Sequence, residues 1–367
     1  MSCGVIVICD RVMWCDREMR KDKSSILDEG ESMSSTVYFV DARENNTPIV
    51  KRLGALVEHL SGDDSLSGNI AVKLHFGEMN NETFIKPFHI KAIIDSLSNL
   101  HKNAKFFLTD TTTLYKGERF NAIDHIMCAV YHGFSPSYMG CPVIIADGLS
   151  DEGVLVSENV EIAKVIYECD AMVVISHATG HGASSYGGAL KNVAMGCVTK
   201  RTKRWQHEVT KPVLNEDICN LCGNCENACG FNVIQIKDGK IHFDSENCIG
   251  CGACIAACDV GALKTAENAS ELIQKRIAYV ASEVLKNVRA YFINFAIHVT
   301  PFCDCAEMSP RFICDDVGVL ASSDPVALDN ATIDLIGVSA FEGDPKVQLR
   351  EAHALGVGRL SYEIRKI

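Results

Sequence analysis

Eight cysteines occur in two copies of one spacing pattern, and this repeat limits the possible folds of the chain more than any other feature. The segments "CNLCGNCENACG" from residue 219 and "CIGCGACIAACD" from residue 248 both read C-x2-C-x2-C-x3-C. Each cysteine of the first copy recurs 29 positions later in the second. Such a repeat indicates a bicluster ferredoxin fold, because three thiolates on one short loop can bind three corners of a [4Fe–4S] cube.

The fourth cysteine of each copy is expected to bind the cluster of the other copy. The first cluster would then be held by Cys219, Cys222, Cys225 and Cys258, and the second by Cys248, Cys251, Cys254 and Cys229. Structural zinc is the alternative, but zinc sites usually separate two CxxC pairs by a long spacer. Gly230 and Asp259 stand where the bacterial pattern has proline, so the turn after the fourth cysteine is expected to differ.

Outside this segment, short apolar runs alternate with amphipathic stretches. The expected strands are 36–40, 69–76, 104–110, 142–147, 171–176, 290–299 and 317–322, and the expected helical stretches include 90–100, 122–134 and 160–169. Such alternation predicts an α/β fold with a mainly parallel sheet and flanking helices. The cysteine repeat lies between the fifth and sixth strands, so we expect a small α+β ferredoxin-like domain of the bacterial 2[4Fe–4S] type that interrupts the α/β domain.

This pattern divides the chain into four parts. We expect an extension at 1–35, the first part of the α/β domain at 36–210, the ferredoxin-like insert at 211–267 and the second part of the α/β domain at 268–367. The extension is charged and rich in serine, and Met33 directly precedes the first strand. It is therefore predicted to be disordered or to result from a start codon placed too early.

Composition limits the cellular compartment and the binding partners that can be expected. No apolar run approaches the roughly 18 residues that a membrane span needs, and no secretory signal is recognisable. Clustered cysteines in a long chain indicate metal binding in the cytoplasm rather than a disulfide scaffold. A formal net charge of −12 argues against general affinity for nucleic acid.

Polar residues follow five of the predicted strands, at the edge where open α/β sheets bind ligands. They are Lys73, His75 and Glu78; Asp110 to Thr113; Asp147 and Gly148; His177 and His181; and Cys303 and Cys305. We therefore predict a site at this edge. Its candidate catalytic residues are His177, His181, Lys191, Cys303 and Cys305, followed by His75 and Asp110.

Several of these residues have more than one interpretation. His177 and His181 could share a metal if the segment were helical, but Gly180 and Gly182 indicate a loop, where anion binding, acid–base chemistry or a structural role are alternatives. Lys191 lies in a segment too apolar for an ordinary surface helix, which favours substrate binding over a solvated charge.

Two further stretches have a structural or a solvent-exposed role as an alternative to ligand binding. Asp110 and the three threonines after it suit a hard cation, hydroxyl recognition or a helix cap. The basic run "KRTKR" at 200–204 suits a phosphate, an acidic carrier protein, RNA or plain solvation.

Cys303 and Cys305 are not needed by the repeat. In an extended segment they would point to the same side, and neighbouring thiols suit chelation, redox closure or covalent chemistry. Cys197 precedes the insert and could approach them, which makes Cys197, Cys303 and Cys305 a candidate third metal site. The cysteines at other apolar positions are expected to be packing residues, namely Cys128, Cys141 and Cys169.

The segments "VKLHFGE", "DTTTLYKGER", "SHATGHGASSYGGALKNVAMGC", "TPFCDC" and "DVGVLASSDPVALD", with the double cysteine motif, resemble the domain-of-unknown-function 362 family. The resemblance runs from about residue 36 to about residue 356. Its members are described as uncharacterised iron–sulfur centre proteins, so it implies the eight cluster cysteines and a redox role without defining a reaction. It also puts the candidate site residues and Cys197 at motif positions.

These observations predict a cytoplasmic, oxygen-sensitive iron–sulfur oxidoreductase. Two clusters would relay electrons between a redox partner, such as a ferredoxin or a reductase, and a site on the α/β domain that acts on a small molecule. A non-catalytic electron carrier that docks a partner is the alternative, followed by RNA modification or sensing. No dinucleotide fingerprint is present, but many flavin sites lack a short motif, so a flavin or an additional metal stays open.

Overall fold

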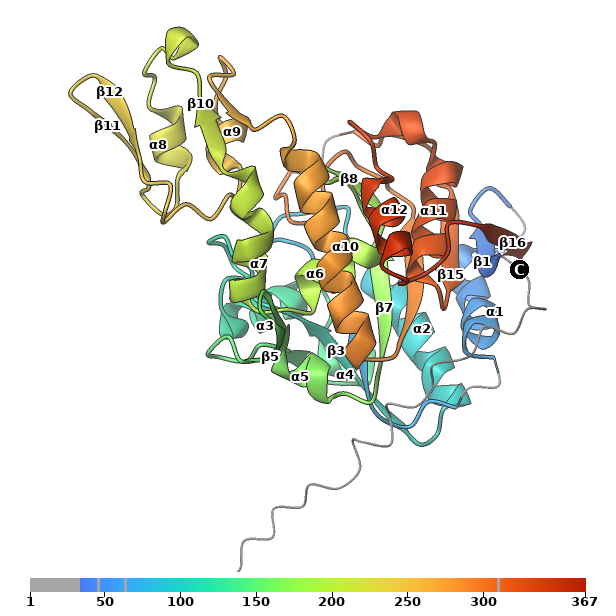
Figure 1. The fold of residues 1–367 in the computed structure, drawn as a ribbon. Coiled ribbons are helices and arrows are strands. Elements are labelled where there is room, and N and C mark those ends of the chain that lie inside the picture. The colour runs from blue at the N-terminus through green and yellow to red at the C-terminus, as the bar shows by residue number, and fades with distance from the viewer. Residues whose placement is uncertain (1–33, 45–46, 63–64, 309–310) are drawn as a thin grey trace, which may run out of the picture. The chain divides into compact units, whose positions relative to one another are not determined.

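An eight-stranded sheet in the order β16-β1-β15-β14-β7-β2-β3-β4 forms the centre of the α/β part in the computed structural model (Figure 1). Its strands are β1 (Ser35–Asp41), β2 (Gly68–Lys73), β3 (Ala104–Asp110), β4 (Val143–Ile145), β7 (Ala171–His177), β14 (Ala290–Ala296), β15 (Gly318–Ser322) and β16 (Tyr362–Lys366). All neighbouring strands are parallel except where β15 pairs with β1 and β14. Every strand but β15 therefore ends at the same edge, which confirms the predicted α/β class and its mainly parallel sheet.

The structure describes residues 34–44, 47–62, 65–308 and 311–367. The prediction of a disordered or mis-started extension therefore falls almost entirely outside the described residues. Among those described, no helix combines the length and the apolar character that crossing a bilayer would require.

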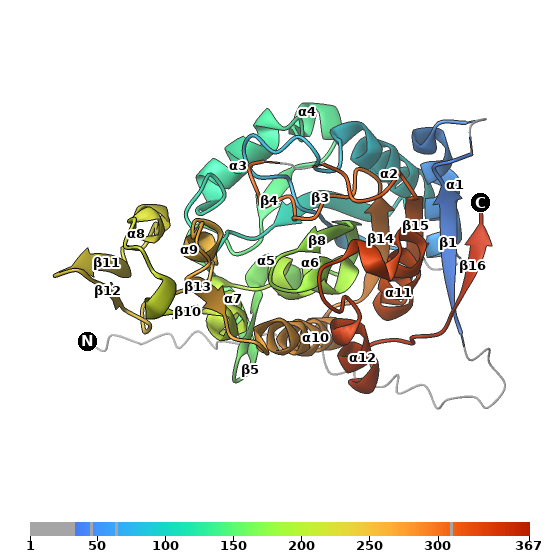
Figure 2. The ribbon, with the colours of Figure 1, turned by 90° about the horizontal axis from the view of Figure 1, so that it is seen from above.

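Helices cover both faces of the sheet (Figure 2). One face carries α1 (Ile49–Ser61), α2 (Pro87–Leu100), α3 (Ala122–Tyr131) and α4 (Pro136–Met139), and the other carries α5 (Lys164–Glu168), α6 (Ala189–Gly196), α10 (Ala269–Asn287), α11 (Pro325–Ile336) and α12 (Val347–Ala354). The central strand β7 is buried throughout and serves both cores. Its Val173 and Ile175 pack toward α2, while Met172 and Val174 pack on the opposite side, because successive side chains alternate.

Two predictions of secondary structure are wrong in part. The stretch 160–169 was expected to be helical, but Val160–Ala163 forms β6, which pairs with β5 (Gly153–Ser157), and α5 begins only at Lys164. The β-branched side chains of Val160 and Ile162, two positions apart, are both fully buried. This alternation of buried side chains suits a strand of a hairpin better than a helix. The edge strand β16 was not predicted, since most of its side chains are exposed and polar.

The remaining elements lie around the sheet edge and in the cysteine-rich segment. They are the hairpin strands β8 (Thr179–His181) and β9 (Ser185–Gly187), helix α7 (Lys200–His207), the 3-10 helices η2 (Glu208–Thr210), η3 (Glu216–Ile218) and η4 (Val338–Ala340), strands β10 (Pro212–Leu214), β11 (Ile234–Lys237), β12 (Lys240–Phe243) and β13 (Leu263–Thr265), and helices α8 (Asn224–Ala228) and α9 (Ala253–Ala256).

The cysteine-rich segment repeats its structure as well as its sequence. Strand β10 pairs with β13 and β11 pairs with β12, and the segment has a small hydrophobic cluster of its own. Helices α8 and α9 both begin after a glycine in the left-handed region, Gly223 at φ 83° and Gly252 at φ 79°. These glycines are equivalent in the 29-residue repeat, so each cysteine loop turns into its helix in the same way.

A buried carboxylate joins α11 to α6. Asp329 accepts hydrogen bonds from the amides of Ala189 at 2.8 Å and Leu190 at 3.0 Å, and from Asn294 Nδ2 at 2.7 Å. A carboxylate at a helix N-terminus satisfies amides that have no partner within the helix. Asp329 thereby fixes the start of α6, the helix that carries Lys191.

We expect Asp329→Ala to lower the free energy of unfolding by about 3–5 kcal/mol, because it leaves several buried donors without an acceptor. Urea unfolding of the full chain, followed by circular dichroism, measures the change. Glu363→Ala, at an exposed position of β16, is the control and should change little. Equal stability of the two variants would contradict the assigned role of Asp329.

Candidate functional site

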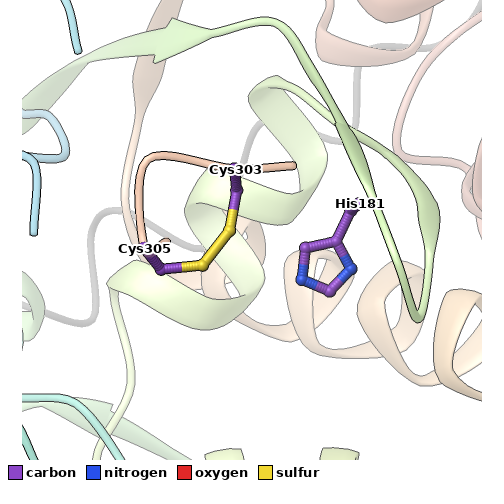
Figure 3. A group of neighbouring side chains, drawn as sticks. All are labelled: His181, Cys303 and Cys305. Atoms are coloured by element: carbon purple, nitrogen blue, oxygen red, sulfur yellow. A yellow bond between two sulfur atoms is a disulfide. The ribbon is translucent and has the colours of Figure 1, made fainter. Parts of the chain in front are cut away.

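Two cysteines and a histidine meet at the carboxyl edge of the sheet. Cys303 and Cys305 are joined by a disulfide, and one ring nitrogen of His181 lies within 4.8 Å of both sulfur atoms (Figure 3). All three side chains are half-buried, so the group is in contact with solvent. The structure thus brings together three of the residues predicted from the polar strand ends.

The geometric reason for this meeting differs from the expected one. We expected Cys303 and Cys305 to share a side of an extended segment, but β14 ends at Ala296 and residues 304–305 form a turn. The amide of Ala306 donates to the carbonyl of Cys303 at 3.0 Å across this turn. The two sulfur atoms therefore meet because the backbone folds back, and strand periodicity plays no part.

Asp304, between the two cysteines, anchors their loop to the end of β7. Its carboxylate lies 2.8 Å and 3.0 Å from His177 Nδ1, while His177 Nε2 lies 2.8 Å from the carbonyl of Ile297. Both ring nitrogens face acceptors, so both must carry protons. Burial alone would lower the pKa of His177, but Asp304 and the Ile297 carbonyl outweigh it and raise the pKa. His177 is a charged residue that positions the loop.

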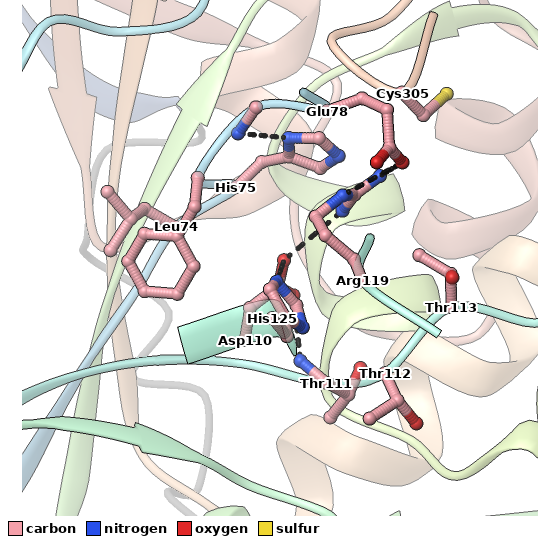
Figure 4. A network of polar contacts seen from close by, with 12 residues as sticks. Leu74, His75, Glu78, Asp110, Thr111, Thr112, Thr113, Arg119, His125 and Cys305 are labelled. Atoms are coloured by element: carbon pink, nitrogen blue, oxygen red, sulfur yellow. Dashed lines mark hydrogen bonds and ion pairs between the residues drawn. The ribbon is translucent and has the colours of Figure 1, made fainter. Parts of the chain in front are cut away.

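A buried layer of charges lies at the ends of β2 and β3 (Figure 4). Lys73 Nζ is 3.0 Å from Asp110 Oδ1, and Arg119 Nη2 is 3.1 Å from Glu78 Oε2. Arg119 Nη1 and His125 Nε2 each lie 3.7 Å from Asp110 Oδ2. Burial alone would raise the pKa of Asp110, but Lys73 and the imidazoles and guanidinium nearby hold it well below its usual range. Asp110 is therefore the counter-ion of several cations.

The threonines after Asp110 belong to a neighbouring network. Thr112 donates its amide to both oxygens of the Asp147 carboxylate at 3.0 Å and its hydroxyl to one of them at 2.5 Å. Lys203 donates to Thr111 Oγ1 at 2.7 Å and to the carbonyl of Thr112. Lys200, in the same basic run, donates to the carbonyl of Phe120 at 2.7 Å. Arg201 donates to the carbonyl of Glu158 at 3.4 Å, so three of the four cations in "KRTKR" form hydrogen bonds within the protein.

Lys191 and His75 lie near the buried charges, and Lys191 also lies near Asp304. Lys191 projects from α6, and its Nζ interacts electrostatically with Asp304 and Asp110. Burial lowers the pKa of Lys191 to about 8. Among the residues that the structure describes, no carboxylate forms an ion pair with Lys191. His75 accepts a hydrogen bond at Nδ1 from the amide of Gly77 at 3.0 Å, and burial lowers its pKa well below 6.5.

Cys197 is not part of this group. Its side chain is fully buried, and its Sγ lies 3.9 Å from the sulfur of Met172 in the core below the sheet. Burial raises the pKa of Cys197 to about 12, so the thiol is protonated. Within the described ranges, the metal-capable group at the sheet edge consists of His181, Cys303 and Cys305 without Cys197. Cys197 ends α6 and faces the core, which sequence spacing could not indicate.

The eight cysteines of the repeat line two small cavities. One cavity is lined by Cys219, Cys222, Cys225 and Cys258. The other is lined by Cys229, Cys248, Cys251 and Cys254. Each cavity takes three cysteines from one copy and the fourth from the other. The donor sets are all sulfur, which suits [4Fe–4S] clusters chemically.

Three residues of the site were not singled out from the sequence. Asp304 could have been identified from the sequence, because it stands between the two cysteines of "CDC". Arg119 ends the run "LYKGER", and His125 looks like an ordinary residue of an amphipathic helix. Their partners Glu78 and Asp110 do not stand at helical or strand spacing from them, so only the fold brings these charges together.

Comparison with known proteins identifies a family. Residues 70–334 match the family model described as "Domain of unknown function (DUF362)". One component of the tetrathionate reductase of Archaeoglobus fulgidus is 50% identical over 48 residues, covering 12% of this chain and 23% of that protein. Two uncharacterized ferredoxins of Methanocaldococcus jannaschii are 34% identical over 58 residues (15% of this chain and 35% of the ferredoxin) and 45% identical over 48 residues (12% and 32%). The chain thus matches only about a quarter to a third of each relative and contains a ferredoxin-like iron–sulfur segment.

Two solved structures show a weak likeness. The lactate racemase apoprotein of Thermoanaerobacterium thermosaccharolyticum is 12% identical with a TM-score of 0.39, covering 72% of this chain and 51% of that one. A protein of Thermotoga maritima is 14% identical with a TM-score of 0.33, covering 67% and 49%.

We expect Asp110→Asn to lower the free energy of unfolding by about 3–5 kcal/mol, because it leaves Lys73 buried without a full counter-charge. Urea denaturation measures the loss. The matched control is Glu152→Gln, which removes an exposed ion pair with Lys164 and should cost less than about 1 kcal/mol. An Asp110→Asn variant as stable as the wild type would show that the layer does not depend on this carboxylate.

The contact between His177 and Asp304 predicts that the stability of the loop around Asp304 depends on pH. Because the pKa of His177 is raised, the contact contributes fully below pH 6.5 and is lost as pH rises through the raised pKa. In Asp304→Asn at pH 6, we expect the Glu78 amide, which donates to the Asp304 carbonyl, to exchange with deuterium on the order of 100-fold faster. The difference from the wild type should shrink at higher pH; a difference independent of pH would contradict this assignment.

Proposed function

The chain belongs to the DUF362 family, and from this membership and the cysteine geometry we propose that it is an iron–sulfur oxidoreductase. In this proposal the cysteine-rich segment binds two [4Fe–4S] clusters. The clusters supply one-electron transfer to or from a redox site on the α/β domain. That site comprises the group at the sheet edge around His181, Cys303 and Cys305.

The observation that carries the proposal is the crossed lining of the two cavities. Cys258 lines the cavity of the first copy, and Cys229 lines the cavity of the second. This exchange of the fourth ligand is typical of two-cluster ferredoxins.

Exposure of two cysteines supports an external redox partner. Cys222 and Cys251, equivalent in the two copies, are exposed, whereas Cys225, Cys248 and Cys254 are buried. Each cluster would thus approach the surface on one side, where a small electron-transfer protein such as a ferredoxin, or a reductase, could dock.

Contacts between the cysteine-rich segment and α7 support an internal route. Thr210, at the end of η2, donates its hydroxyl to the carbonyl of Gly250 at 2.8 Å. Gly250 packs so closely that an added Cβ would lie 2.1 Å from the carbonyl oxygen of His207. The imidazole of His207 in turn interacts electrostatically with Lys191 and His181. The loop of the second cysteine copy therefore packs against α7, the helix that carries His207.

Single substitutions of the two crossed cysteines test the proposal. We expect anaerobically purified wild-type protein to contain roughly eight irons and eight sulfides, and Cys258→Ser and Cys229→Ser each to lose about half. EPR of the reduced variants should show the loss of interaction between two reduced clusters. Cys128→Ser, at a buried cysteine outside the repeat, is the control and should keep all the iron.

Stoichiometric zinc in place of iron would contradict the proposal. So would an iron content that neither Cys258→Ser nor Cys229→Ser reduces. A full complement of iron that a reduced ferredoxin cannot reduce would refute electron exchange with that class of partner.

A further inference from the structure

The chemistry of the sheet-edge site can be narrowed further, on the basis of the proposed function. We propose that Cys303 and Cys305 form a redox-active dithiol–disulfide couple in which the N–H of His181 stabilises the thiolate that forms. The S–S bond takes up two electrons and two protons and breaks into two thiols. The electrons come one at a time from a low-potential donor of the ferredoxin class, His181 Nε2 donates a hydrogen bond to the nearer sulfur as it becomes anionic, and solvent supplies both protons.

Hydrogen bonds to His181 decide which ring nitrogen carries the proton. Nδ1 accepts from the amide of Ala183 at 3.2 Å and from the amide of Ser184 at 3.1 Å. Amides only donate, so Nδ1 is unprotonated, and the proton of the neutral ring is on Nε2. Burial lowers the pKa of His181 well below 6.5, which keeps the ring neutral at pH 7. Figure 3 shows one ring nitrogen turned toward the disulfide and the other turned away.

The same hydrogen bonds disfavour a metal ion at this group. A metal-binding imidazole offers an unprotonated nitrogen to the metal and usually donates from its other N–H to an acceptor. In His181 the nitrogen away from the sulfur atoms is the acceptor, so Nε2 facing them is the donor. An N–H directed at a sulfur pair suits a hydrogen bond to the thiolate that forms when a disulfide breaks.

Backbone hydrogen bonds to neighbouring segments hold the loop of the two cysteines in place. The amide of Gly180 donates to the carbonyl of Thr300 at 2.8 Å, and the amide of Glu78 donates to the carbonyl of Asp304 at 2.8 Å. An added Cβ on Gly180 would lie 2.4 Å from the carbonyl oxygen of Pro301, so only glycine permits this approach. The Cα atoms of the two cysteines are 5.3 Å apart, which suits a disulfide, and the anchored backbone keeps the thiols near each other after reduction.

The charge near the sulfur pair favours the same chemistry. Lys191 interacts electrostatically with both His181 and Asp304. An ammonium near a thiol stabilises the thiolate, which is the species formed when a disulfide breaks. By contrast, burial raises the pKa of Cys128 and of Cys141 to about 11, so these two packing thiols stay protonated and unreactive.

Mass spectrometry of alkylated thiols tests the couple directly in the full-length protein. Trypsin releases residues 290–311 as one peptide, in which Cys303 and Cys305 are the only cysteines. Anaerobic protein is equilibrated in dithiothreitol redox buffers, quenched and alkylated. We expect peptides with no label or with two labels, in a ratio that changes tenfold for about 30 mV, as a two-electron couple requires.

A second arm measures the role of His181. In His181→Leu we expect the rate of double labelling after addition of dithiothreitol to fall on the order of tenfold, because the forming thiolate loses a hydrogen bond. His353→Leu, at an exposed histidine of α12, is the control and should react at the wild-type rate. An unchanged rate in His181→Leu would refute its role as hydrogen-bond donor to the thiolate.

Other outcomes overturn the couple itself. Peptides that always carry two labels, or that never carry any, would show that the cysteines do not cycle. Zinc, nickel or copper that is retained by the wild type and lost in a Cys303→Ser, Cys305→Ser double variant would assign the group to a metal.

The test also separates the couple from the proposed function. Dithiothreitol reaches the disulfide without the clusters, so normal labelling in protein without iron supports the couple and refutes the clusters. Normal labelling with dithiothreitol, but none with reduced ferredoxin in protein of full iron content, supports the couple and refutes the electron supply.

Discussion

The ion pair between Lys73 and Asp110 is the interaction around which the sheet edge is organised. Both side chains are almost completely buried, at 1% and 5% exposure, so each charge requires the other. Lys73 also donates to Asn192 of α6 at 2.6 Å, and Asp110 also attracts Arg119 and His125. One pair thereby joins two neighbouring strands to a helix on each face of the sheet.

Above this charged layer lies a group of a different kind. His181, Cys303 and Cys305 are half-buried, whereas the charged residues of the layer are almost completely buried and held by ion pairs. The anchor between the two groups is Asp304, whose carboxylate pairs with His177 and whose carbonyl accepts from the amide of Glu78. A site whose residues are positioned by a buried support keeps its geometry, and this arrangement is typical of active sites.

Some of this architecture could be predicted because it depends on local patterns. Runs such as 104–110 and 171–176 are apolar, β-branched and bounded by turns, and they became β3 and β7 with at most one residue of difference. The polar strand ends could be predicted as a site because parallel strands bring their carboxyl ends to one edge. Strand β16 could not, since its hydrogen-bonded partner β1 lies at the other end of the chain. The division of 160–169 could not either, since the hairpin with β5 overrides a pattern that also suits a helix.

The sequence by itself determined the ferredoxin-like segment, since spacing within a short loop is what a cubane cluster requires. It also determined the α/β class and the edge at which polar residues gather. Only the tertiary structure decided the partners at that edge: His177 binds Asp304, Cys197 faces the core, and His181 meets the sulfur pair. The physical reason is that charge pairing and the choice of imidazole proton depend on contacts between residues more than a hundred positions apart, or on a backbone turn, and neither leaves a periodic signal in the sequence.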